Sequence, residues 1–361
     1  KAIKADALRN PETLEFFRLT IDHLKRILEI HPVILAHDLH PDYLSSIYAR
    51  EQTELPTLAV QHHHAHIVSC LAEHGVHGPV IGLALDGTGL GTDGTVWGGE
   101  ALLADLSSFK RLAHLECVPL PGGDAAAKDP WRMALAFLDA VYGDELFNLP
   151  IPFVKDLSAG EARVVLQMAR RGINSPLTSS CGRLFDAVSA VLGIRTRTAY
   201  EGQAAVELEM SQNPREQGHY PWLVEDEADQ RVLKTSVTFR AVVEDIRRGA
   251  PKGTISRRFH NTLVHSFTEV CDILRDDTGV AHVALSGGAF QNVTLLTGLT
   301  RALTERGFCV YSHRHVPTND GGVALGQAVC AASRYAGFCG KAGNFVVGSP
   351  LRKEASQGKT G

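Results

Sequence analysis

The residues best suited to chemistry in this sequence are four histidines within five positions, in the run Gln61-His62-His63-His64-Ala65-His66. His62 and His66 are four residues apart, so on a helix their imidazoles lie on one face. Two imidazoles at this spacing can bind a single transition-metal ion. A surface run of histidines, or histidines that only form hydrogen bonds, would give the same pattern. His63 and His64 are not assigned as ligands, and we expect them to surround the site or face solvent.

A carboxylate far along the chain is the candidate third ligand. Asp320 lies in Asn319-Asp320-Gly321-Gly322, where a loop meets the start of a predicted helix. An aspartate at such a position usually caps the helix. A metal ion already bound by His62 and His66 would make it a ligand instead, and three protein ligands would leave open positions for a substrate. Imidazole and carboxylate suit zinc and ferrous iron about equally, so the metal is not identified.

A glycine-rich segment, Asp86 to Gly94, is the first candidate for binding an anion. It separates two strand-like runs, 80–85 and 95–103, and predicts a β-hairpin with a wide polar tip. Glycines let backbone N–H groups approach a phosphate closely, and threonine hydroxyls add donors. The segment is neither a dinucleotide fingerprint nor a P-loop, because no Gly-Lys-Ser/Thr follows. An ordinary glycine-rich hairpin is the alternative.

A second candidate is Ser286-Gly287-Gly288, where a predicted strand, 281–285, runs into a predicted helix, 289–306. The amino end of a helix carries partial positive charge and free N–H groups. The two glycines would let a nucleotide lie flat against the backbone, and Asn292 could reach its ribose or base. A tight turn that needs glycine only for its dihedral angles is the alternative.

Two further helix starts carry acidic groups that could bind ribose hydroxyls. They are Ser179 to Asp186 and Tyr200 to Ala205, the latter including Gly202. The alternative for either acid is a carboxylate favoured by the helix dipole.

The bulk composition limits the classes of function. The 361 residues are 44 % hydrophobic and 21 % charged, as in a globular protein with two domains or lobes. The net charge of −4 argues against recruitment of nucleic acid or an anionic membrane. No apolar run reaches the roughly 18 residues that a membrane span needs. The seven cysteines form no C-x-x-C pair, which is typical of reduced thiols in a cytoplasmic protein.

Strands and helices alternate at both ends of the chain, which predicts an α/β fold with parallel pairing. Helices begin near Pro11 and Pro41, and strands span 33–36 and 57–60, before a helix that carries the histidines. Near the other end, strand 308–312 precedes helix 320–335. Helical patterns dominate between about 125 and 275, at 129–142, 160–171, 182–192, 202–210 and 253–275.

Taken together, these segments resemble the C-terminal domain of the HypF carbamoyltransferases, from about Pro11 to about Tyr335. That domain is related to the threonylcarbamoyl-transferase subunit that modifies tRNA and to antibiotic O-carbamoyltransferases. The matching segments, in order, are Asp38-Leu39-His40-Pro41-Asp42-Tyr43, the histidine cluster, Asp86 to Glu100, Pro130-Trp131-Arg132, Gly182 to Ala187, Tyr200 to Ala204, Ser286-Gly287-Gly288, and Asn319 to Gly322.

The resemblance implies an actin-like ATPase (ribonuclease-H-like) fold with two lobes around a nucleotide cleft. The first lobe would be 1–78, with the metal-binding histidines, and the second 79–340, with the nucleotide loops and a helical insert at 125–275. A flexible tail would follow at 341–361. An actin-like first lobe opens with its own β-hairpin, whereas Lys1 to Arg9 stand there, so we expect this lobe to be partial.

The resemblance also implies the roles of the site residues. His62, His66 and Asp320 would bind the metal, and Asp86, His62 and His66 would take part in catalysis. The residues expected at the phosphates and carbamoyl group are Leu85, Asp86, Gly87, Thr88 and Gly89. Those expected around the ribose and adenine are Asp186, Gly202, Gly287, Gly288 and Asn292.

In this family, ATP and carbamoyl phosphate give a carbamoyl-adenylate in a separate upstream domain. The domain resembled here passes the carbamoyl group to the C-terminal cysteine of HypE, where it becomes a cyanide ligand of nickel–iron hydrogenase. The implied cofactors are one divalent metal, zinc or Fe(II), the adenylate derived from ATP, and Mg beside the nucleotide. The implied partners are HypE and the upstream adenylate-forming domain, and no cysteine of this chain is assigned as catalytic.

Two other functions remain open from the sequence. Threonylcarbamoyl transfer to tRNA uses the same fold and metal, but Trp97 to Glu100 and Pro130 to Arg132 favour the HypF branch, and no basic stripe offers a tRNA footprint. A nucleotide-binding scaffold without catalysis is the second.

Overall fold

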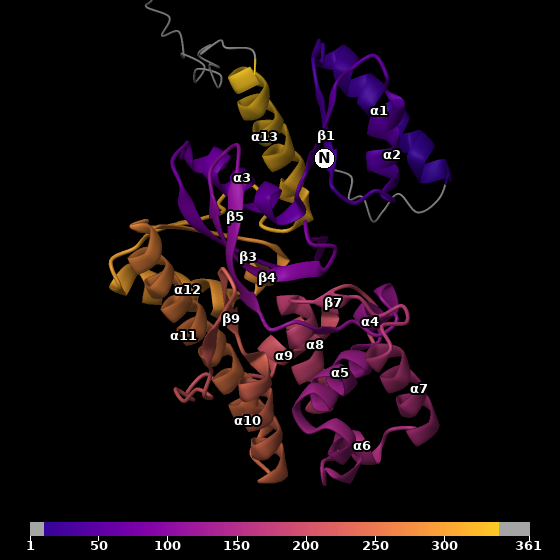
Figure 1. Ribbon diagram of the computed structural model, residues 1–361, viewed down its shortest axis with the longest axis vertical. Helices are drawn as coiled ribbons and strands as arrows, with labels where there is room; N and C mark the ends of the chain where they lie inside the picture. The colour runs from indigo at the N-terminus through magenta and orange to yellow at the C-terminus, as the bar shows by residue number, and fades with distance from the viewer. Residues whose placement is uncertain (1–10, 339–361) are drawn as a thin grey trace, which may run out of the picture.

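A mixed β-sheet forms the centre of the molecule, and its strands run in the order β11-β10-β3-β4-β5-β9-β8 (Figure 1). The short strand β7 pairs with β4, and β6 pairs with β7. The computed structural model describes residues 11–338. β10 pairs in parallel with both β3 and β11, whereas β3 and β4 form an antiparallel hairpin. The predicted α/β class is therefore confirmed. The strands are β3 (Val80–Leu90), β4 (Val96–Ala104), β5 (Phe109–Leu115), β6 (Val118–Pro119), β7 (Leu177–Thr178), β8 (Val224–Glu227), β9 (Gln230–Leu233), β10 (His282–Ser286) and β11 (Cys309–Ser312).

Helices cover both faces of this sheet. Side chains alternate along β3, so successive residues pack against different layers. Leu83 and Leu85 join the large apolar core made with the helices drawn in the lower half of Figure 1. Ala84 faces the opposite way and packs with Ile67 and Leu71 of α3 (His62–His74). The helices of the lower half are α4 (Asp124–Lys128), α5 (Pro130–Tyr142), α6 (Pro152–Lys155), α7 (Ala159–Arg170), α8 (Cys181–Val191), α9 (Gln203–Met210), α10 (Thr235–Arg247), α11 (Lys252–Thr278) and α12 (Val293–Glu305).

The amino-terminal segment contains a second, two-stranded parallel sheet made of β1 and β2. In chain order, the elements of this segment are α1 (Pro11–Ile27), β1 (Leu35–Asp38), α2 (Leu44–Glu51) and β2 (Thr57–Val60), and β2 leads directly into α3. The last helix, α13 (Val323–Phe338), runs between this small sheet and α3 in Figure 1 and contacts both. The start of α13 is thereby brought beside the start of α3.

The structure corrects the expected hairpin tip. The predicted turn from Asp86 to Gly94 is wrong, because β3 continues to Leu90 and its pairing with β4 shifts register between Leu85 and Gly89. Only residues 91–95 connect the strands. Glycine is needed at position 89, where a Cβ atom would lie 2.6 Å from the His63 ring. The segment expected as a loop is therefore an irregular strand held against α3.

Other boundaries also differ from the prediction. The helix expected over 289–306 is interrupted at Asn292, which caps α12, and the residues before it form the 3₁₀ turn η3 (Gly288–Gln291). The helix expected from residue 320 begins with another such turn, η4 (Asp320–Gly322). A further 3₁₀ segment, η2 (Gly143–Asn148), follows α5. The sequence patterns missed α10 and the strand β5.

The division into lobes 1–78 and 79–340, with its insert at 125–275, stays a prediction. The expected tail at 341–361 and the opening residues Lys1 to Arg9 lie outside the described residues. Between residues 11 and 338, no helix has both the length and the apolar character needed to cross a bilayer.

Gly326 allows α13 to lie unusually close to α3. A Cβ atom at this position would lie 1.9 Å from the carbonyl oxygen of Ala65, which is backbone and cannot rotate away. We expect Gly326→Ala to lower the free energy of unfolding by about 1–3 kcal/mol, as overpacked cores do. Urea unfolding followed by circular dichroism would measure the change.

Gly160→Ala is the matched control, since it also lies in a helix but has no neighbouring atom within 4 Å of the added methyl group. It should leave stability unchanged or raise it slightly. Equal stability of the two variants would contradict the close packing of α3 and α13.

Candidate metal centre and adjoining cleft

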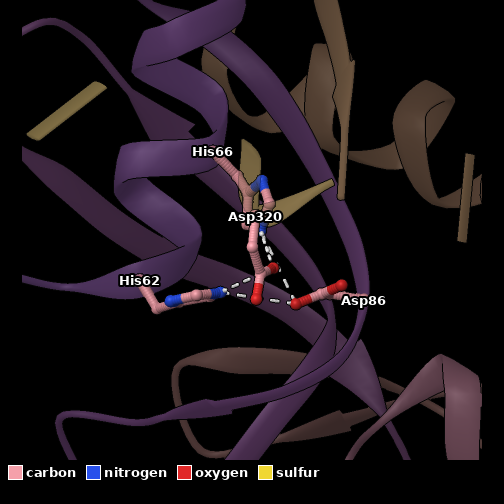
Figure 2. A group of neighbouring side chains, drawn as sticks. All are labelled: His62, His66, Asp86 and Asp320. Carbon is pink, nitrogen blue, oxygen red and sulfur yellow. Dashed lines mark ion pairs between the residues drawn. The ribbon is translucent and has the colours of Figure 1, made fainter. Parts of the chain in front are cut away.

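Four side chains from three separate segments converge at the start of α3 (Figure 2). The Nε2 atom of His62 lies 3.4 Å from Oδ2 of Asp86 and 3.6 Å from Oδ1 of Asp320. The Nε2 atom of His66 lies 3.6 Å from the same two oxygens. The structure thus brings together the three predicted metal ligands, and it adds Asp86 to the group.

Local structure explains how each side chain reaches this point. The side chain of Gln61 caps α3 by accepting a hydrogen bond from the His64 N–H, so the helix begins at His62 and its first turn presents His62 and His66 together. Asp86 follows Ala84 by two residues and therefore faces α3 as well. Asp320 opens the turn η4, where Asn319 accepts a hydrogen bond from the Gly321 N–H.

The donor set fits a divalent metal ion. The Nε2 atoms of His62 and His66 are buried and have no hydrogen-bond partner, which is costly unless something else occupies them. Ligands about 2.1 Å from a tetrahedral ion lie about 3.4 Å apart, close to the four measured separations. Buried imidazoles and carboxylates are also the ligands that zinc and ferrous iron accept.

Opposite charges dominate the electrostatics of this group. Burial lowers the pKa of His62, but the nearby carboxylates of Asp320, Asp38 and Asp86 outweigh it and hold that pKa well above its ordinary value. Burial raises the pKa of Asp86, but His62 and His66 outweigh it and hold the pKa well below its ordinary range. The same two imidazoles outweigh burial at Asp320 and lower its pKa as well, so the carboxylates of Asp86 and Asp320 are both ionised at neutral pH and able to bind a cation.

Asp38 is a residue of this site that the sequence analysis did not assign. Its Oδ2 atom lies 2.8 Å from Nδ1 of His62, and its Oδ1 atom accepts a hydrogen bond from the His40 N–H. A carboxylate on the far nitrogen of an imidazole fixes the orientation of the ring and raises its basicity. The signal lay in the polar run Asp38 to Tyr43, which follows a strand.

A cleft of about 1060 Å³ opens beside the four side chains. Its lining includes Asp86, Gly87, Thr88 and Gly89 from β3, together with Gly202, as predicted for a nucleotide site. Apolar residues of α1 line another wall, and Lys128 and Arg183 contribute positive charge. Clefts that bind small molecules typically measure about 300–1,000 Å³, so this one is large enough for such a ligand.

Other predicted site residues do not line this cleft. The Leu85 side chain is buried in the large core, so at most its backbone could meet a ligand. Asp186 is buried with its Oδ2 atom 2.9 Å from Nε of Arg183, and burial raises its pKa to about 6 against the opposing effect of that cation. Gly287 packs against the Leu85 carbonyl, where a Cβ atom would lie at 2.2 Å. The Gly288 N–H donates to Oδ1 of Asp86.

Asn292 uses both polar atoms of its side chain within the protein. Its Oδ1 atom accepts from the Leu295 N–H and caps α12, and its Nδ2 atom lies 2.9 Å from Nε2 of His260. Because His260 Nδ1 already faces the Ser256 carbonyl, its Nε2 atom is the acceptor of that bond. These two bonds use one Nδ2 hydrogen and one acceptor site of Oδ1, and the residue does not line the cleft, so its nucleotide role stays a prediction.

Comparisons with known proteins point to one family. The profile described as "Carbamoyltransferase, Kae1-like Domain, second subdomain" matches residues 82–327, and the "HypF Kae1-like domain" matches residues 6–73. Carbamoyltransferase HypF2 of Cupriavidus necator is 41 % identical over 352 residues, covering 91 % of this chain and 43 % of that protein. A carbamoyltransferase HypF homolog of the same organism is 40 % identical over 309 residues, covering 82 % of this chain and 77 % of that protein.

A solved structure is similar as well. The crystal structure of full-length HypF in its phosphate- and nucleotide-bound form superposes with a TM-score of 0.86 at 43 % identity, over 90 % of this chain and 50 % of that one. The chain therefore spans about half the length of that protein, and less than half the length of HypF2.

Proposed function

The chain belongs to the Kae1-like domain family of the HypF carbamoyltransferases, and from this premise we propose that it transfers a carbamoyl group from carbamoyl-adenylate to the C-terminal cysteine of HypE. The adenylate would come from a separate adenylate-forming domain that uses ATP. The carbamoylated cysteine would then be the precursor of a cyanide ligand of nickel–iron hydrogenase. We place this reaction in the cytoplasm, where thiols stay reduced.

The observation that carries this proposal is the convergence of His62, His66, Asp86 and Asp320 at the edge of a cleft large enough for a nucleotide. The first three contribute buried groups, and Asp320 is only partly exposed. Such a site can hold an ion in a position that still faces a ligand.

His62, His66, Asp86 and Asp320 would hold the metal, either zinc or Fe(II). When bound, it would supply Lewis-acid polarisation of a carbonyl or phosphoryl oxygen. The backbone between Asp86 and Gly89 would lie along the phosphate and carbamoyl groups, with Mg accompanying the nucleotide. Gly202 would lie toward the ribose, and Asp38 would keep the ring of His62 oriented.

The nucleophile would be supplied by the partner. Among the described residues, Cys70, Cys181 and Cys330 are buried, and burial raises the pKa of each thiol to about 12. A thiol with such a pKa is almost entirely protonated at neutral pH and is a poor nucleophile. Cys117 and Cys309 are less buried but do not line the cleft, which supports an acceptor cysteine from outside the chain.

The test mixes the protein with chemically prepared carbamoyl-adenylate and HypE, and follows carbamoylation of the HypE C-terminal cysteine by mass spectrometry. We expect Asp86→Asn to slow the transfer by at least about 100-fold, the usual cost of removing one electrostatic contributor from an active site. Asp124→Asn, which also lines the cleft but lies outside the group of four, should keep most of the activity.

Other results would favour the two alternatives. Nucleotide binding without transfer to HypE would indicate a scaffold. Tight, salt-sensitive binding of tRNA in a filter assay at low and physiological salt would indicate threonylcarbamoyl transfer instead.

A further inference from the structure

Three buried side chains linked by hydrogen bonds connect α3 to the loop that carries Asp320. The Oε2 atom of Glu73, near the end of α3, lies 3.1 Å from Nδ1 of His313. The Nε2 atom of the same ring lies 2.8 Å from the hydroxyl oxygen of Ser286, at the end of β10. The side chains of Glu73 and His313 are 7 % and 4 % exposed, and Ser286 is completely buried.

The Glu73 carboxylate also holds the backbone of that loop. Its Oε1 atom accepts hydrogen bonds from the N–H groups of Arg314, at 2.9 Å, and His315, at 2.6 Å. Burial raises the pKa of Glu73, but these two bonds and the contact with His313 outweigh it and lower that pKa below its ordinary value. Glu73 is therefore an anion at neutral pH with three partners from one short segment.

The other end of the loop is tied to the sheet. The Gly287 N–H donates to the Thr318 carbonyl at 2.9 Å, and the Thr318 hydroxyl donates to the Gly287 carbonyl at 3.1 Å. The segment from His313 to Thr318 is thus held at both ends, and Asp320 follows it by two residues. Since Glu73 shares a helix with His62 and His66, its contacts relate the Asp320 loop directly to the helix of the two imidazoles.

The order serine, histidine, carboxylate is also that of a hydrolytic triad. A nucleophilic serine must meet its substrate, however, and Ser286 has no exposed surface and does not line the cleft. Its neighbour Gly287 also packs tightly against the Leu85 backbone, where a Cβ atom would lie 2.2 Å from the carbonyl oxygen. A nucleophilic role for Ser286 is therefore the weaker interpretation.

We propose that Glu73, His313 and Ser286 are positioning residues for the metal centre, and that they set its affinity and geometry by fixing the loop of Asp320 against α3. The inference rests on the proposed metal centre but not on carbamoyl transfer. Removing Glu73 would free the loop, so that Asp320 would no longer be held at the distance from His62 and His66 that an ion requires.

The test uses Co(II), whose visible absorption reports coordination geometry, and Zn(II) in a competition titration. For Glu73→Ala, which removes every one of these contacts, we expect a 10–100-fold weaker Kd, the usual cost of changing a group behind a metal ligand, and a changed Co(II) spectrum. Glu116→Ala is the matched control, because Glu116 also accepts a backbone N–H, from Ser236 at 2.8 Å, away from the site. It should leave both readouts unchanged.

The outcomes separate the two proposals. Failure of the wild-type protein to bind either ion would contradict the proposed metal centre itself. Wild-type affinity and an unchanged spectrum in Glu73→Ala would overturn the positioning role, as would loss of carbamoyl transfer in Ser286→Ala with unchanged metal binding, which would instead make Ser286 a nucleophile. If Glu73→Ala fails to fold, His313→Gln removes the imidazole between Glu73 and Ser286, is measured in the same way, and should also weaken metal binding.

Discussion

Replacing His66 with glutamine is expected to abolish stoichiometric metal binding. His66 is completely buried, and its Nε2 atom lies 3.6 Å from both Asp86 and Asp320. Changes behind a metal ligand cost roughly 10–100-fold in affinity, so removal of a ligand should weaken binding by more than about 100-fold. Elemental analysis of anaerobically purified protein, followed by a competition titration, would measure the loss.

His64→Gln is the matched control for this prediction. His64 is also fully buried in the first turns of α3, but its Nε2 atom lies 2.8 Å from the Asp105 carbonyl and its Nδ1 atom lies near the Cys330 sulfur. Its replacement should disturb packing and leave the metal content unchanged. Equal metal content in wild type and His66→Gln would contradict the proposed metal centre.

The second large effect concerns stability. Arg111→Ala is expected to lower the free energy of unfolding by about 3–5 kcal/mol, because it leaves the completely buried carboxylate of Glu100 without its cation. The Nε atom of Arg111 lies 2.6 Å from Glu100, and its other nitrogens bond Asp93 and Ser179. The guanidinium also lies 4.3 Å from the centre of the Trp97 ring. Chemical unfolding curves would give the difference.

Arg170→Ala shows why burial decides this effect. Arg170 also contacts two carboxylates, Asp139 and Asp144, but its own side chain is 44 % exposed. Water and salt screen such a pair, so its loss should cost less than about 1 kcal/mol. If the two variants were equally stable, the Glu100 pair would contribute no more than a surface contact.

The ion pair between Arg111 and Glu100 is also connected to the candidate site through hydrogen bonds. Glu100 accepts hydrogen bonds from the Gly98 and Gly99 N–H groups and contacts the Ser179 hydroxyl. The next residue, Ser180, contacts the backbone carbonyls of Asp86 and Gly87. The buried ion pair therefore helps to set the path of the strand that carries Asp86 into the metal centre.

Local patterns predicted much of the fold. The four-residue spacing of His62 and His66 on a helix, the strand at 57–60 and the helix from Pro11 are all found. Each depends on neighbours in the chain, namely apolar periodicity and helix capping, which act over a few residues. The strand β5 and helix α10 were missed. Each packs on its neighbour in the chain, β4 and α11, but also on a distant element, β9 for β5 and α5 for α10, so part of their burial depends on partners far away in sequence.

Residue types and their spacing were enough to indicate which residues could bind a metal and which family the segments resemble. They placed His62, His66 and Asp320 in one proposed site, although 254 positions separate His66 from Asp320. Which side chains lie next to these residues could be seen only in the tertiary structure. Asp86 lies beside the three predicted ligands because β3 continues past Leu85. The side chains of Asn292 and Leu85 lie inside the protein instead. The physical reason is that spacing along the chain fixes the face on which a side chain lies, whereas burial and hydrogen-bond partners depend on which layers pack together.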